Sequence, residues 1–151
     1  MVTRHLRRSG FASAGLLAGV LLLIAEPAAA ELSYYKLQLS GAGGGDPDGS
    51  AHGTLSIDSE TGRIVWGLYY EGIGAPTAMH IHRGAGGESG GVIVPLNVES
   101  KLGDGALTGT VTADMAAVQE ILAAPEAFYL NIHTGDFRGG ALRAQLGVRW
   151  E

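Results

Sequence analysis

The sequence predicts an all-β protein, an antiparallel β-sandwich of immunoglobulin-like or flattened-barrel form, with one short helix. Apolar and polar residues alternate with a period of two in about eight short runs, as in strands that bury one face. Glycine accounts for 25 of the 151 residues without a collagen-like period, which indicates many tight turns. A single segment departs from the alternation and has helical spacing instead.

The strand-like runs follow one another with turn sequences between them. A Gly, Asp and Pro loop precedes the second run, and "SETG" separates it from the third, so these two runs are expected to form a hairpin. No internal repeat and no second domain are apparent. The expected strands are 35–40, 51–58, 63–72, 77–82, 90–96, 105–112, 127–134 and 141–150.

The helical segment lies between the sixth and seventh of these strands. Thr112 or Asp114 is suited to cap its beginning, and Pro125 to end it, which leaves a helix of about ten residues. Its apolar stripe is expected to face the core. The stripe consists of Met115, Val118, Ile121 and Leu122.

Residues 1–30 have the composition of a signal peptide. Three arginines precede an uncharged apolar stretch, Phe11–Ala25, and the small residues Ala28–Ala30 fit a cleavage site. The apolar stretch is shorter than the ~20 residues that a membrane-spanning helix needs, so no retained membrane anchor is expected. We therefore expect a secreted or periplasmic protein whose mature domain is 31–151.

The charge balance is acidic, with 10 Lys and Arg against 15 Asp and Glu, and three of the arginines lie in the expected leader. No basic cluster remains to contact phosphates, so nucleic acid is not an expected partner. The chain contains no cysteine. Packing or a bound metal, rather than disulfides, must therefore stabilise an exported domain of this size.

The histidines outside the leader all fall on the polar faces of their strands. His80 and His82 are two apart on one strand, so their side chains emerge from the same face ~6.6 Å apart and can converge on one ion. Imidazole without thiolate suits zinc, copper or nickel. The candidate metal ligands are His80, His82 and His133, and His52 joins them only if its strand lies beside that of His80.

A second interpretation gives the same histidines a structural role. They would then hydrogen-bond backbone groups of neighbouring loops, among them the turn 84–91, "GAGGESGG", whose glycines favour positive φ. No helix follows this turn, so it is expected to join two strands rather than to hold a phosphate. Spacing alone leaves a metal site, a structural role and a catalytic histidine open.

Signals for enzyme chemistry are weak and favour a protein without enzyme activity. No G-x-S-x-G elbow is present, and the carboxylates occur singly in turns rather than as a paired acid and base. Glu71, Glu88 and Asp136 are the carboxylates that could approach the histidines. Arg143 and Gln145 alternate outward on the last strand and are expected to be solvated.

Two motifs together resemble the chordin (CHRD) domain family. They are "AMHIHRGAGGESGGVIVPL" and "FYLNIHTGDFRGGALRAQL", separated by the short helix, and the earlier "GTLSID" and "TGRIVWGLYYEG" also fit. Arg138, Ala141 and Ala144 replace a proline, a glutamate and a glycine of the family pattern. The matching positions are His80, Ile81, His82, Gly84, Gly87, Gly90, Val92, Val94, Leu96, Tyr129, Asn131, His133, Thr134, Gly139, Gly140, Leu142, Arg143, Gln145 and Leu146.

The resemblance implies an exported, immunoglobulin-like or related β-sandwich. Family members occur in bacteria as a single small secreted domain, and in animals within a larger extracellular regulator of growth-factor signalling. For bacterial members the resemblance implies no established enzyme activity.

The leading functional hypothesis is an exported binding or structural module of CHRD type, whose ligand is an undetermined protein or small molecule. His80, His82 and His133, with Asn131, would form its site. A protein-interaction module would instead use exposed sheet edges or the face bearing Arg143 and Gln145.

The alternative hypothesis is a periplasmic copper- or zinc-binding protein. The strand bearing His80 and His82 resembles that of copper/zinc superoxide dismutase, which implies superoxide-dismutase-like or other metal chemistry. The disulfide cysteines and the zinc loop of that enzyme are missing here.

Overall fold

The computed structural model describes residues 31–98, 103, 105–147 and 149–150. The signal peptide expected at 1–30 lies outside these residues. The elements in chain order are β1 Leu32–Ser40, β2 Ser50–Asp58, β3 Arg63–Glu71, β4 Pro76–Arg83, β5 Val92–Leu96, β6 Ala106–Thr112, α1 Met115–Ala123, the 3-10 helix η1 Pro125–Ala127, β7 Phe128–Thr134, β8 Leu142–Gln145 and β9 Arg149–Trp150.

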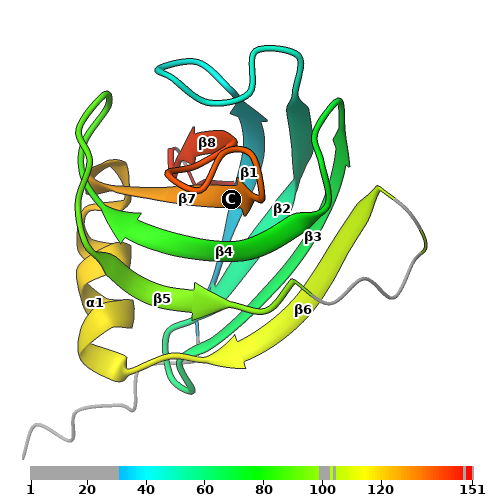
Figure 1. The fold of residues 1–151 in the computed structure, drawn as a ribbon. Coiled ribbons are helices and arrows are strands. Elements are labelled where there is room, and N and C mark those ends of the chain that lie inside the picture. The colour runs from blue at the N-terminus through cyan, green and yellow to red at the C-terminus, as the bar shows by residue number, and fades with distance from the viewer. Residues whose placement is uncertain (1–30, 99–102, 104, 148, 151) are drawn as a thin grey trace, which may run out of the picture.

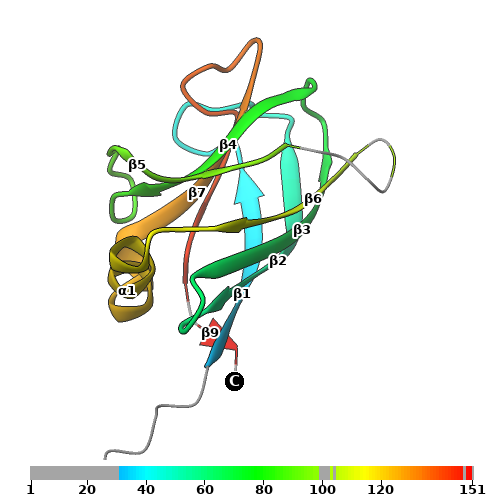
Figure 2. The ribbon, with the colours of Figure 1, turned by 90° about the horizontal axis from the view of Figure 1, so that it is seen from below.

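The strands form one antiparallel sheet in the order β5-β4-β7-β8-β1-β2-β3-β6, and β9 pairs with the beginning of β1. The sheet curls until its two outermost strands, β5 and β6, come into contact. Figures 1 and 2 show β4 and β5 lying across from β1, β2 and β3, with α1 at one side. The predicted all-β fold is confirmed, in its flattened-barrel form.

The interior of the barrel is filled by the apolar residues of the period-two runs. On β1 the even-numbered side chains face outward, whereas Tyr35, Leu37 and Leu39 are buried. The same alternation buries Leu55 and Ile57 on β2. Burial of this apolar surface is the main stabilising contribution to the fold.

The predicted helix is confirmed as α1. The Asp114 side chain accepts a hydrogen bond from the Ala116 backbone N–H and so caps its beginning. Pro125 cannot continue the helix and starts η1 instead. Val118 and Ile121 are fully buried against the barrel. Among the described residues, no helix is long and apolar enough to cross a membrane.

The last predicted strand, 141–150, is divided in two. β8, which lies between β7 and the end of β1, stops at Gln145, and β9 then pairs with Tyr34 and Tyr35 near the beginning of β1. β7 also differs from the prediction, because most of its residues are buried whichever face they occupy. Its outer face is covered by the 84–91 turn and by the 135–141 loop, and this covered face carries the candidate site.

Candidate functional site

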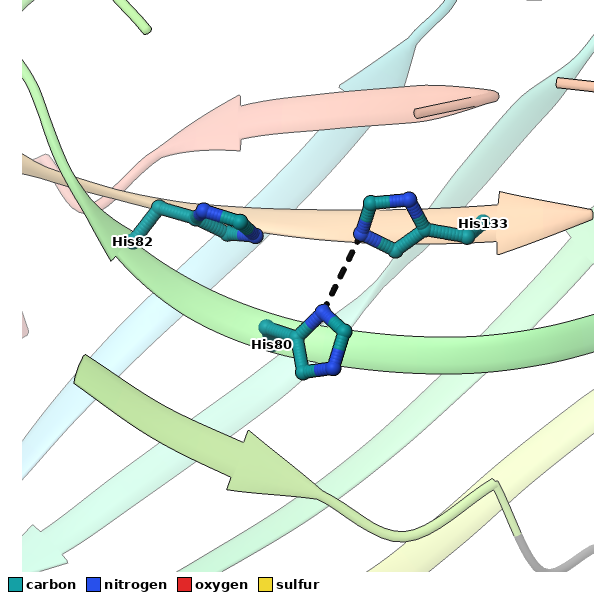
Figure 3. Close-up of side chains that lie close together, drawn as sticks. All are labelled: His80, His82 and His133. Carbon is teal, nitrogen blue, oxygen red and sulfur yellow. Dashed lines mark hydrogen bonds between the residues drawn. The ribbon is translucent and has the colours of Figure 1, made fainter. Parts of the chain in front are cut away.

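The register of β4 and β7 brings three histidines onto one face of the sheet. Ala78 lies opposite His133, and His80 lies opposite Asn131. Alternation places His80 and His82 on the same side of β4, where His133 of β7 joins them (Figure 3). The three rings, which belong to three of the four candidate ligands named from the sequence, point toward one another.

The ring nitrogens are spaced closely enough for a shared ion. His80 Nδ1 lies 3.1 Å from His133 Nε2, and one ligand atom from each of the three residues lies within 4.8 Å of the other two. Nitrogens bound tetrahedrally at ~2.0–2.1 Å from one ion are about 3.3 Å apart, and the separation between His80 Nδ1 and His133 Nε2 is already close to this value.

Two backbone carbonyls fix the orientation of two of these rings. His82 Nδ1–H donates to the Gly90 carbonyl over 3.0 Å, and His133 Nδ1–H donates to the Arg138 carbonyl over 2.9 Å. A carbonyl only accepts, so in each neutral ring the lone pair lies on Nε2. Such contacts to the second nitrogen are the usual way in which proteins orient metal-binding histidines.

His82 Nε2 is a buried ring nitrogen of the cluster that the fold leaves unpaired, as it does Trp66 Nε1 elsewhere in the barrel. It is buried, and within the described part of the chain it has no hydrogen-bond partner. The whole residue is only 8% exposed. A buried acceptor without a partner is costly, and such groups in native proteins commonly mark an ion, a water or a functional role.

Burial also affects the charge state of His80. The pKa of His80 is lowered from its ordinary value, first by burial and then by the neighbouring His133 and His82. The imidazole of His80 therefore stays neutral to lower pH than that of a solvated histidine. Neutral imidazole is the form that binds metal ions.

The ring of His82 is held in place by a stack of side chains. Tyr129 stacks on His82 with ring centroids 5.0 Å apart and planes 10° from parallel. On Tyr129 lies the Arg143 guanidinium, whose central carbon is 3.4 Å from the ring centroid. The Tyr129 hydroxyl in turn accepts from the Gly90 N–H at 3.4 Å. This stack therefore ties the ring of His82 to the turn whose carbonyl orients it.

Arg143 and Gln145 hold the 84–91 turn over this stack. Arg143 donates to the carbonyls of Ala85 and Glu88, and the Gln145 amide donates to the Gly84 carbonyl at 2.7 Å. The expectation that these two side chains are simply solvated is therefore wrong. Sequence reasoning missed this because the Arg143 contacts join residues 55 and 58 positions apart, and no local pattern signals them.

Asn131 and the carboxylates that could approach the histidines have other contacts. Asn131 donates to the Gly139 carbonyl at 3.3 Å and so helps to hold the 135–141 loop. Glu71 accepts from Ser50, and Glu88 accepts from the Ala85 N–H. Within the described chain, no carboxylate belongs to the three-histidine group.

His52 is separate from the other three histidines. It lies on β2, opposite Gln38 of β1 and Tyr69 of β3, and it stacks on Tyr69 at 5.9 Å between ring centroids. Three strands, β7, β8 and β1, stand between β4 and β2 in the sheet order. The condition under which His52 would be a fourth ligand, a strand beside that of His80, is not met.

A pocket opens beside the cluster. It has a volume of about 370 Å³, and His80 and His133 are among the residues that line it. His82 does not line it, since this ring is covered by the 84–91 turn. The other lining residues are Thr77, Ala78, Thr134, Gly135 and Arg138. The three histidines therefore combine a covered side, at His82, with an accessible side, at His80 and His133.

Comparison with known families matches the CHRD domain over residues 35–146. The matched span begins in β1, ends just after β8 and includes the three clustered histidines. No match was found among curated proteins or among solved structures. Because the family match covers most of the chain, the protein belongs to the CHRD domain family.

Proposed function

We propose that this protein is an exported binding module whose ligand is a single copper or zinc ion, held by His80, His82 and His133. The observation that carries the proposal is the convergence of three imidazoles with ligand atoms within 4.8 Å of one another. Chance proximity of polar side chains rarely includes orientation of the rings, yet two of these rings are oriented by backbone carbonyls.

The donor set narrows the choice of ion. Three neutral nitrogen donors without thiolate or carboxylate suit zinc or copper better than magnesium or calcium, which prefer oxygen. Copper(II) is expected to bind more tightly than zinc at a given nitrogen site. Three protein ligands also leave a coordination position open, as in zinc sites that bind a further group.

Metal content and binding heat test the proposal directly. The purified protein is stripped with a chelator, loaded with copper or zinc, and measured by elemental analysis and by isothermal titration calorimetry. We expect one ion per chain. His82→Ala and His133→Ala should each weaken binding by at least tenfold, because only two ligands remain.

His52→Ala is the matched control, since it removes an imidazole from the same barrel outside the cluster. It should leave stoichiometry and affinity unchanged. Wild-type protein that takes up much less than one equivalent at neutral pH would contradict the proposal. Equal losses in His52→Ala and His82→Ala would contradict it as well, because they would show binding unrelated to the cluster.

A further inference from the structure

The pocket beside the histidines has a cationic wall. Of the described residues that line it, Arg138 is the one that carries a permanent charge, and no carboxylate contributes. Thr77 and Thr134 also line the pocket, where the Thr77 hydroxyl donates to the His133 carbonyl and the Thr134 hydroxyl accepts from the Phe137 N–H. The domain as a whole is acidic, with a formal net charge of −5 for the full chain, so this local excess of positive charge runs against the overall balance.

Arg138 is tied to the cluster through its own backbone. Its carbonyl accepts from His133 Nδ1–H at 2.9 Å, while its side-chain Nε donates to the Gly135 carbonyl at 3.4 Å. Arg138 is exposed. Among the described residues the ion pair found joins Arg83 to Glu120, so Arg138 has no carboxylate partner there. The same residue thus orients one ligand and carries an uncompensated charge at the pocket.

The proposed metal ion would favour the binding of an anion in the pocket beside it. Three neutral imidazoles do not reduce the charge of a divalent ion, so its +2 charge stays uncompensated by protein ligands. The accessible side of the cluster, at His80 and His133, is the side that the pocket reaches. A fourth ligand that enters from the pocket therefore enters a space that is lined by two of the proposed ligands and by Arg138.

We propose that this pocket binds a small anion, which completes the coordination of the metal ion and pairs with Arg138. The proposal rests on the proposed metal site. The anion is an oxygen or nitrogen donor, carried either by an inorganic ion or by the carboxylate of a small molecule. Arg138 is then a specificity-determining residue of the site, which selects negatively charged ligands over neutral ones.

Azide is a suitable probe for an inorganic anion, and acetate is a suitable probe for the carboxylate of a small molecule. Each is titrated into the copper(II)-loaded protein, and binding is followed by the change in the copper absorption and electron paramagnetic resonance spectra. The variants are Arg138→Gln, Arg138→Lys and, as a control for the lost charge, Arg63→Gln. Arg63 begins β3, a strand that pairs with neither β4 nor β7, and it donates to Thr110 Oγ1.

We expect saturable binding of at least one probe, weakened about five- to tenfold by Arg138→Gln, because one favourable charge interaction is lost. Arg138→Lys should retain most of the affinity and Arg63→Gln all of it. If Arg138→Gln loses affinity for only one of the two probes, the proposal is supported. The probe affected then shows whether the pocket favours an inorganic anion or a carboxylate.

The test separates this inference from the metal proposal. Copper content is measured first for every variant, and Arg138→Gln should still hold one ion because it keeps the backbone carbonyl. One ion per chain with no spectral response to either probe overturns the anion site alone. Equal affinities in Arg138→Gln and Arg63→Gln also overturn it. Failure to load copper overturns the proposed function, and the anion site with it.

Discussion

His80 Nδ1 and His133 Nε2 face each other at 3.1 Å, and a single proton lies between them. His133 Nδ1–H already donates to the Arg138 carbonyl, so in the neutral ring His133 Nε2 is the acceptor and His80 Nδ1–H is the donor. This proton occupies the place that a metal ion would take. Binding of an ion between the two rings therefore requires His80 to change tautomer.

The first prediction concerns that change. Zinc should move the His80 proton from Nδ1 to Nε2, because the Nδ1 lone pair becomes the ligand, whereas His82 and His133 keep Nδ1–H. Nitrogen-15 NMR of the imidazole rings distinguishes the two tautomers, and zinc is diamagnetic. A His80 ring that still carries its proton on Nδ1 at zinc saturation would show that this nitrogen is not a ligand.

The second prediction concerns the turn that orients His82. A Cβ added at Gly90 would lie 2.0 Å from the Arg83 carbonyl oxygen, so the backbone must shift, and with it the carbonyl that accepts from His82. Gly91→Ala is the matched control, since a Cβ there meets nothing within 4 Å.

Gly90→Ala should reduce metal affinity by about tenfold or more, the usual effect of losing a group that orients a ligand. Gly91→Ala should change it little. Calorimetric titration of the two variants with copper measures the difference. If both alanine variants bind as tightly as the wild type, the Gly90 carbonyl does not orient the ligand.

The contact between His82 and Gly90 is one that the sequence predicts only in part. Alternation and helical spacing locate the strands and α1, because a strand that buries one face must repeat every two residues. The same alternation places His80, His82 and His133 on polar faces, and the family motifs connect them. The register that makes them neighbours pairs β4 with β7, about fifty positions later in the chain, and no local pattern encodes it.

How deeply the site is buried is harder to predict from the sequence than which residues form it. His82 is 8% exposed because the 84–91 turn covers it, and the turn is held by Arg143 and Gln145 from the far end of the domain. Polar residues at alternating positions normally indicate a solvated face, so sequence reasoning treats these two side chains as surface. The division of 141–150 is missed for a related reason, since it concerns pairing with β1, which lies far earlier in the chain.

The third prediction tests Arg143 as a positioning residue. Arg143→Gln removes donors to the Ala85 and Glu88 carbonyls and the contact with the Tyr129 ring. The free energy of unfolding should fall by about 1–2 kcal/mol, since hydrogen bonds from a charged donor and a cation–π contact are lost in a partly exposed place. Amide hydrogen exchange should accelerate within 84–91.

Urea denaturation and exchange mass spectrometry provide the two measurements. Arg63→Gln is again the control, because the Arg63 side chain has a single described hydrogen bond, to Thr110 Oγ1. A turn that exchanges no faster in Arg143→Gln than in Arg63→Gln would mean that other contacts hold the 84–91 turn.

The fourth prediction concerns the metal-free protein in acid. The pKa of His80 is lowered in the folded state by burial and by the other two histidines, so below its ordinary value of 6.5 the unfolded chain binds more protons at this residue than the folded protein does. Stability therefore falls as the pH decreases through about 6.5, and it stops falling, as far as His80 is concerned, below the folded-state pKa. Above about pH 7 this residue contributes no pH dependence.

Urea denaturation of the chelator-treated protein between pH 7.5 and 5 measures the effect. His80→Gln should flatten the pH dependence of the unfolding free energy, whereas His52→Gln, which lies outside the cluster, should preserve it. The same slope in His80→Gln and in the wild type would show that other groups destabilise the fold in acid. A flatter slope only in His80→Gln would link acid sensitivity to the residue that must stay neutral to bind the proposed ion.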